Sequence, residues 1–178
     1  MRKILVLISC ILISGSVSSK LSVTNKYTIS AYIEEFKVTA ICEMNRVGIP
    51  ASITLAQAII ESGYGNSSLA IYANNHFGIK NKPDWNGELY NAGSICYKKY
   101  GSALESYVDH SNHIKSRKWY ASLFNLKIND YKGWAHGLKK AGYAEDIYYA
   151  YRLIKIIEMF KLYDFDKEYS PLFSITAK

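Results

Sequence analysis

Glu61 is the candidate for a catalytic general acid in this sequence. Glu61 follows a stretch from Ala51 to Ile60 that is apolar on nearly every side, and it precedes the glycine-rich turn Gly63-Tyr64-Gly65. A helix that is hydrophobic all round is buried, and both burial and the negative end of a helix dipole disfavour an ionised carboxylate. Both effects raise the pKa of Glu61, as a general acid near neutral pH requires. Gln57 lies one helical turn earlier and can face the same space, whereas the simpler alternative is a helix-terminal Glu that faces solvent.

Other reactive residues form weaker patterns. His110 and His113 have the i, i+3 spacing of a metal pair on a helix, but no further ligand completes a site. Cys96 and His136 could form a Cys/His peptidase pair, yet nothing near the cysteine marks its thiol as activated. We therefore expect neither a metal nor a cofactor.

The elements that must position Glu61 are mostly helices. Apolar periodicity and capping residues predict helices over residues 30–47, 51–60, 68–73, 102–115, 118–123, 131–141 and 146–162. The last of these is expected to bury Ile147 together with the apolar residues that follow it. Turn signals and short apolar runs predict strands at residues 89–90 and 95–97. The predicted fold class is α+β, mostly helical, with one small β insert between about Phe77 and Tyr100.

The start of the chain has the pattern of an export signal. Arg2 and Lys3 precede an apolar stretch over residues 4–13 and a small-residue run over residues 14–19. The apolar stretch has about 10 residues, short of the roughly 20 that a membrane span needs. We predict a signal peptide at residues 1–19 and a single domain at residues 20–178, with its core at about 30–166. Such a protein acts in the periplasm, the cell envelope or outside the cell; lipoprotein anchoring through Cys10 is the less favoured alternative.

Composition and charge limit the classes of protein and of binding partner that we expect. The chain has 178 residues, of which 49% are hydrophobic and 21% charged, which excludes a disordered or multi-span protein. Its net charge of +7 suits an anionic partner such as a wall polymer. Because no Arg/Lys run is interleaved with aromatic residues, we expect no nucleic-acid partner. Cys42 and Cys96 would remain after export, and a bridge between them stays open at this level.

Four ordered blocks of residues carry a family resemblance. The stretch from Gly48 to Ser67, containing Gln57-Ala58-Ile59-Ile60-Glu61-Ser62-Gly63-Tyr64-Gly65, resembles the signature of the glycoside hydrolase family 73 glucosaminidases of bacterial autolysins and flagellar peptidoglycan hydrolases. Three further blocks follow in family order, namely Asn74-Asn75-His76-Phe77-Gly78-Ile79-Lys80, Tyr97-Lys98-Lys99-Tyr100-Gly101-Ser102 with Glu105-Ser106, and Gly142-Tyr143-Ala144-Glu145-Asp146. Together they cover about residues 32–166.

This resemblance implies a lysozyme-like fold with a small β-hairpin lobe beside a glycan cleft. The implied reaction is hydrolysis of the β-1,4 bond between N-acetylglucosamine and N-acetylmuramic acid in peptidoglycan strands. Glu61 matches the general acid of the family, and Tyr143 matches a tyrosine that supports activity. The residues expected to bind substrate or shape the cleft are Gln57, Asn75, Phe77, Gly78 and Trp85.

Two departures from the family pattern bear on mechanism. Asn81 stands where related sequences often carry a cysteine, and Ile95 stands where they often carry an acidic residue. Glu88 is the remaining carboxylate between Trp85 and Tyr100, so it is the candidate for the second catalytic carboxylate. An inverting enzyme needs such a group about 6.5–9.5 Å from the acid, whereas substrate-assisted hydrolysis does not.

Two other functions remain as alternatives. A lytic transglycosylase also uses a lone Glu followed by Ser on a lysozyme-like fold, and a non-catalytic wall-binding module could lack the second carboxylate. The intact Glu61 and Tyr143 favour an enzyme over the module. We expect a monomer.

Overall fold

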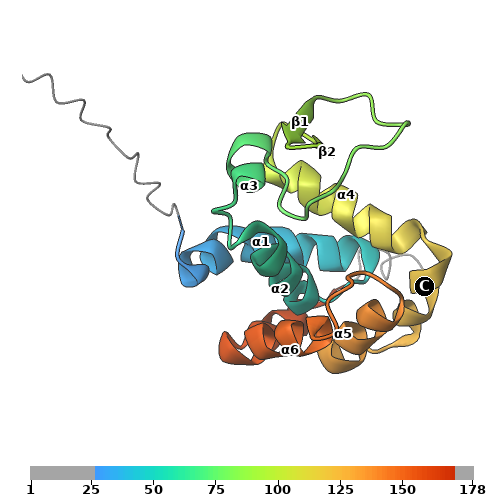
Figure 1. Ribbon diagram of the computed structural model, residues 1–178. Coiled ribbons are helices and arrows are strands. Elements are labelled where there is room, and N and C mark those ends of the chain that lie inside the picture. Colours follow the sequence, from blue (N-terminus) through green and yellow to red (C-terminus); the bar gives the residue numbers. More distant parts are fainter. Residues whose placement is uncertain (1–26, 171–178) are drawn as a thin grey trace, which may run out of the picture.

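The computed structural model describes residues 27–170, and the predicted signal peptide, including Cys10, lies outside the described residues. The described chain is mostly helical with a two-stranded sheet. Its elements in order are α1 (Ile29–Val47), α2 (Ala51–Ser62), α3 (Ser68–Ala73), β1 (Leu89–Ala92), β2 (Ile95–Lys98), α4 (Ala103–Ser116), the 3₁₀ helix η1 (Lys118–Asn125), α5 (Tyr131–Lys140), α6 (Tyr149–Met159) and the 3₁₀ helix η2 (Leu162–Glu168). The hairpin and α3 lie at one end of the molecule, and α5 and α6 lie at the other (Figure 1).

Helix α2 is the centre of the core. It packs against α1, α5, α6 and η2, and all of its first nine residues are buried. This confirms the inference drawn from its uninterrupted apolar sequence. The helix runs two residues further than predicted, because Gly63 adopts a left-handed conformation (φ 55°) and donates its N–H to the carbonyl of Ile59. Glu61 therefore lies within the last turn of α2 rather than beyond it.

A carboxylate from the opposite end of the described chain holds the start of α2. Asp166, in η2, accepts hydrogen bonds from the backbone N–H (2.9 Å) and the hydroxyl (2.7 Å) of Ser52. Only 2% of Asp166 is exposed, and this burial raises the pKa of its carboxyl to about 6 against the lowering effect of the Ser52 hydrogen bonds. The helix that carries Glu61 is thus fixed by a cap at each end.

The β lobe is a tight antiparallel hairpin. Leu89 pairs with Lys98 at the open end, and Ala92 pairs with Ile95 beside a two-residue turn that begins with Gly93 (φ 60°). A single bridge between Lys80 and Tyr97 fastens the segment that follows α3 to the hairpin. Through this bridge the small sheet orients the chain between α3 and β1.

The last helix differs from its prediction. Helix α6 covers Tyr149–Met159 instead of residues 146–162. The carboxylate of Asp146 accepts the N–H of Tyr148 in a turn before the helix, and Lys161 takes a left-handed conformation after it. The expectation that Ile147 is buried was wrong, because Ile147 precedes the helix and is 74% exposed.

The two cysteines among the described residues are not joined to each other. Cys42 on α1 and Cys96 on β2 are both free thiols, so the bridge considered between them is not formed.

Among the described residues, no helix combines the length and the apolar character that a membrane crossing needs. The predicted signal peptide, residues 1–19, lies outside the residues to which this finding applies.

Candidate active site

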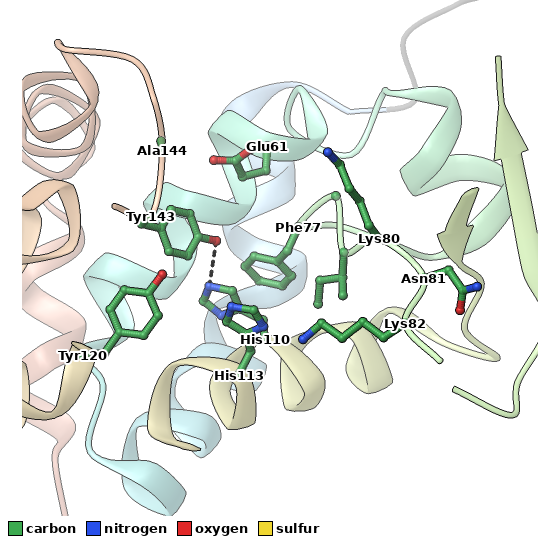
Figure 2. Close-up of a pocket in the computed structure, with 12 residues that line it drawn as sticks. Glu61, Phe77, Lys80, Asn81, Lys82, His110, His113, Tyr120, Tyr143 and Ala144 are labelled. Carbon is green, nitrogen blue, oxygen red and sulfur yellow. Dashed lines mark hydrogen bonds between the residues drawn. The ribbon is translucent and has the colours of Figure 1, made fainter. Parts of the chain in front are cut away.

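A pocket of about 440 Å³ opens where the end of α2 faces the segment after α3. Its wall consists of Glu61 from α2, residues 77–82, His110 and His113 from α4, Tyr120 from η1, and Tyr143 with Ala144 from the loop before α6. Tyr120 and Tyr143 lie across the pocket from Lys80 and Lys82 (Figure 2). Phe77 lies between the tyrosine side and the lysine side (Figure 2). This volume is within the range of small-ligand sites.

Glu61 is held by a chain of two hydrogen bonds. The hydroxyl of Tyr149 donates to Oε1 of Glu61 (3.2 Å) and accepts from the side-chain amide of Gln57 (3.2 Å). Burial raises the pKa of Glu61, while the Tyr149 hydroxyl and, more weakly, the charge of Arg152 act to lower it. The net rise favours the protonated carboxyl, which is the form that a general acid needs.

A stack of rings orders the wall beside Glu61. The hydroxyl of Tyr143 is 3.1 Å from Nε2 of His110 (Figure 2). The ring of Tyr143 stacks on Tyr149 with centroids 5.5 Å apart. Phe77 stacks on His110 with centroids 3.9 Å apart. Burial lowers the pKa of His110 to about 3, so its imidazole is neutral at neutral pH. Tyr143 is therefore fixed in position by a neutral partner, with its hydroxyl in the pocket wall.

Two predicted substrate-binding residues act beneath the pocket surface. Asn75 is buried, and its amide nitrogen donates to the carbonyls of Ile79 and Lys98 while its oxygen accepts the N–H of Ile79. Gln57 has no exposed surface and contacts Tyr149. In this structure both residues position the groups that line the pocket. Phe77 and Gly78, by contrast, line it themselves.

Trp85 and Glu88 are not brought to this pocket. Trp85 lies in a separate hollow with Tyr100, and its indole N–H donates to the backbone carbonyl of Glu88. The carboxylate of Glu88 is 74% exposed and forms an ion pair with Lys99 at 2.6 Å, which lowers its pKa. Glu61 is the one carboxylate among the described residues that line the pocket.

The histidine pair has a place in the pocket wall. His110 and His113 both line the pocket, and burial lowers the pKa of His113 to about 4. Within residues 27–170 no group of three or more His, Cys, Asp or Glu side chains is arranged to hold a metal ion. His110 contributes through its contacts with Phe77 and Tyr143.

The most informative residue that the sequence analysis missed is Tyr149. It begins the buried stripe of α6 that continues through Leu153 and Ile157. A tyrosine in such a stripe signals a hydroxyl that needs a partner on a neighbouring element. Its partner could not be read from the sequence, because Glu61 is 88 positions away.

Replacing Tyr149 with Phe tests its control over Glu61. The hydroxyl stabilises the ionised carboxylate, so its removal raises the pKa of Glu61 further. We expect the alkaline limb of the kcat/KM profile to move to higher pH, with about a tenfold or smaller loss at the optimum because the acid is less well positioned. Tyr151→Phe, which removes an exposed hydroxyl from the same helix, is the matched control. Equal loss at every pH would contradict this role.

The sequence is similar to a known enzyme family and to several characterised proteins. The family described as mannosyl-glycoprotein endo-β-N-acetylglucosaminidase, or glucosaminidase, matches residues 37–162. Exo-glucosaminidase LytG of Bacillus subtilis is 32% identical over 137 residues, which cover 70% of this chain and 49% of that protein. Peptidoglycan hydrolase FlgJ of Vibrio cholerae is 24% identical over 151 residues, which cover 75% of this chain and 45% of that protein. The chain thus spans about half the length of these relatives.

Solved structures agree with this result. The glycoside hydrolase domain of FlgJ from Salmonella typhimurium superimposes with a TM-score of 0.64 at 25% sequence identity. The match covers 76% of this chain and 89% of that domain. The lysozyme-like α+β fold predicted from the sequence is therefore confirmed, together with its small hairpin lobe.

Proposed function

Because the chain belongs to the glucosaminidase family of glycoside hydrolases, we propose that it cleaves the β-1,4 bond between N-acetylglucosamine and N-acetylmuramic acid in peptidoglycan. The observation that carries this proposal is the half-buried carboxyl of Glu61, which lies in the pocket with a raised pKa. A protonated carboxyl at this position can donate its proton to the leaving oxygen of the sugar. Tyr143 provides a fixed hydroxyl in the same wall.

The second catalytic role is assigned to the substrate. Glu61 is the one carboxylate in the described pocket wall, and Glu88 is engaged by Lys99 outside it. In substrate-assisted hydrolysis the acetamido oxygen of N-acetylglucosamine attacks its own anomeric carbon as Glu61 protonates the leaving oxygen. Water then opens the cyclic intermediate, so the anomeric configuration is retained. The geometry supports this route better than an inverting route through Glu88.

The variant Glu88→Gln separates the two routes. Since Glu88 is exposed and lies outside the pocket wall, we expect hydrolysis within about twofold of the wild-type rate, as for other surface substitutions away from a site. The measurement is kcat/KM on purified peptidoglycan, with the anomer of the first product followed by NMR. A loss of about 100-fold or more would assign the general base to Glu88, and an inverted product would rule out the substrate-assisted route.

The product ends identify the reaction. Purified peptidoglycan is digested with the protein, reduced with borohydride and analysed by mass spectrometry. A reduced N-acetylglucosamine end is the expected result. A 1,6-anhydro-muramyl end would identify a lytic transglycosylase instead, and binding without new ends would identify a wall-binding module.

The length of the products tests the mode of cleavage. We propose endo cleavage, as the family description has it, although LytG is named an exo-glucosaminidase. Fragments from the middle of the strands are expected early in the digest, whereas release of only terminal units would indicate exo cleavage. A monomer that acts in the periplasm, the cell envelope or outside the cell fits this substrate, and relatives named autolysin and peptidoglycan hydrolase support that location.

A further inference from the structure

One side of the pocket carries two lysines that have no ion-pair partner among the described residues. Lys80 and Lys82 both line it, on the side opposite Tyr143 and Tyr120 (Figure 2). Neither lysine forms an ion pair with the described part of the chain. The proposed catalytic use of Glu61 needs that carboxyl protonated, so it does not supply the missing negative charge.

The surroundings of Lys82 disfavour its positive charge. Burial and the nearby cations Arg117 and Lys98 lower the pKa of Lys82, and the opposing effects of Asp84 and Asp109 do not cancel them. Asp109 is already engaged, since it pairs with Lys98 at 2.9 Å and accepts the hydroxyl of Tyr100. The site therefore lacks an anion rather than a cation.

Arg117 adds an unfilled donor. Its Nε atom is buried and has no hydrogen-bond partner within the described residues. The guanidinium of Arg117 lies over the ring of Trp119, 5.0 Å from the ring centroid, and its charge is not paired with an anion among the described residues. Arg117 lies close enough to lower the pKa values of both Lys82 and His113, which line the pocket. Arg117 does not line the pocket itself, so it would act on an anion bound beside Lys82 through its charge.

The proposed substrate carries such a group at the right place. In N-acetylmuramic acid the lactyl ether and its peptide stem are attached to the carbon next to the one that bears the leaving oxygen. When Glu61 protonates that oxygen, the stem must leave the sugar within or beside the same pocket. Carboxylates are the anions of this stem, and lysine and arginine bind them by charge-assisted hydrogen bonds.

We propose that Lys82 and Lys80, supported by the charge of Arg117, form a subsite for the carboxylates of the peptide stem, so that the protein prefers glycan whose stems carry free carboxylates over glycan whose stem carboxylates are amidated. This inference rests on the proposed function and specifies its substrate. Phosphate groups of wall-linked polymers present similar chemistry, and the choice of substrates in the test separates the two sources.

The experiment compares three preparations of the same peptidoglycan. One is untreated, one is stripped of phosphate polymers with hydrofluoric acid, and one is stripped and then has its stem carboxylates converted to neutral amides with a carbodiimide and ammonia. We expect kcat/KM to be unchanged by the first treatment and to fall about fivefold to tenfold after the second, which is within the range of one net hydrogen bond. A fall at the first treatment would assign the subsite to phosphate, and equal rates on all three would overturn it.

Matched variants assign the preference to the lysine. Lys82→Gln is expected to lose most of the preference for glycan with free stem carboxylates, because its kcat/KM on that substrate falls towards its value on the amidated substrate, and Lys82→Arg is expected to keep the preference. Lys127→Gln removes the same charge from an exposed position outside this pocket and should behave as the wild type. A Lys82→Gln variant that keeps the full preference would contradict the subsite. If no preparation is hydrolysed, it is the proposed function that fails.

Discussion

Replacement of Glu61 with Gln is expected to lower the rate of peptidoglycan hydrolysis by about 100-fold to 10,000-fold, the range that general acid catalysis contributes. The substitution removes the proton that the leaving oxygen receives and changes the side-chain volume little. Tyr149 can still donate to the amide oxygen of the new side chain, so the hydrogen-bond chain from Gln57 keeps its geometry. The loss should therefore appear in kcat, with binding of the glycan retained.

The measurement is the release of reducing ends from purified peptidoglycan, together with the melting temperature of each protein. Glu145→Gln is a suitable control, because Glu145 is an exposed carboxylate in the loop that carries Tyr143 and does not line the pocket. Its rate should match that of the wild type. Retention of more than about a tenth of the activity by a folded Glu61→Gln protein would rule out the general-acid role.

Local patterns in the sequence were sufficient to predict several helices and strands. The capping residue Ser102 starts α4 and bonds the N–H of Glu105, as its spacing predicted. The apolar stretch after Pro50 forms a buried helix, and the strands lie within two residues of their expected positions. Periodicity and capping act over a few residues, so they are visible in a single sequence.

The contacts that tune the site were not visible in the same way. Tyr149 reaches Glu61 across 88 positions, and Asp166 reaches Ser52 across 114. Such pairs depend on how whole helices pack, which no local pattern specifies. The same limit explains the placement of Glu88, since its neighbours along the chain gave no sign that it would turn away towards Lys99.

The start of the sequence sets a different limit. The export signal was inferred from Arg2, Lys3 and the apolar run that follows, and it stays a prediction because residues 1–26 lie outside the described structure. What the structure adds is a physical reason for each proposal about the site, above all the carboxyl of Glu61 and the lack of an ion-pair partner for Lys82 among the described residues.

Asp166→Asn is expected to change how the stability of the whole domain depends on pH. The pKa of Asp166 is about 6 in the folded protein, and an aspartate in an unfolded chain titrates near 3.9. Because folding raises this pKa, the stability that Asp166 contributes is fully present below about pH 4 and is lost as pH rises through 6. The free energy of unfolding of the wild type should therefore fall by about 2 kcal/mol relative to the variant between pH 4 and pH 7.

Urea unfolding of both proteins at pH 4 and pH 7 measures this difference. Asp164→Asn is the matched control on η2, since Asp164 is solvent-accessible and pairs with Lys167 rather than with α2. That control should follow the pH dependence of the wild type. A difference between wild type and Asp166→Asn that stays constant with pH would mean that Asp166 is not buried as an ionised group at pH 7. If instead the difference follows the expected course, burial of the ionised Asp166 carboxylate lowers the free energy of unfolding at pH 7. This carboxylate binds the start of α2, the same helix whose last turn holds Glu61.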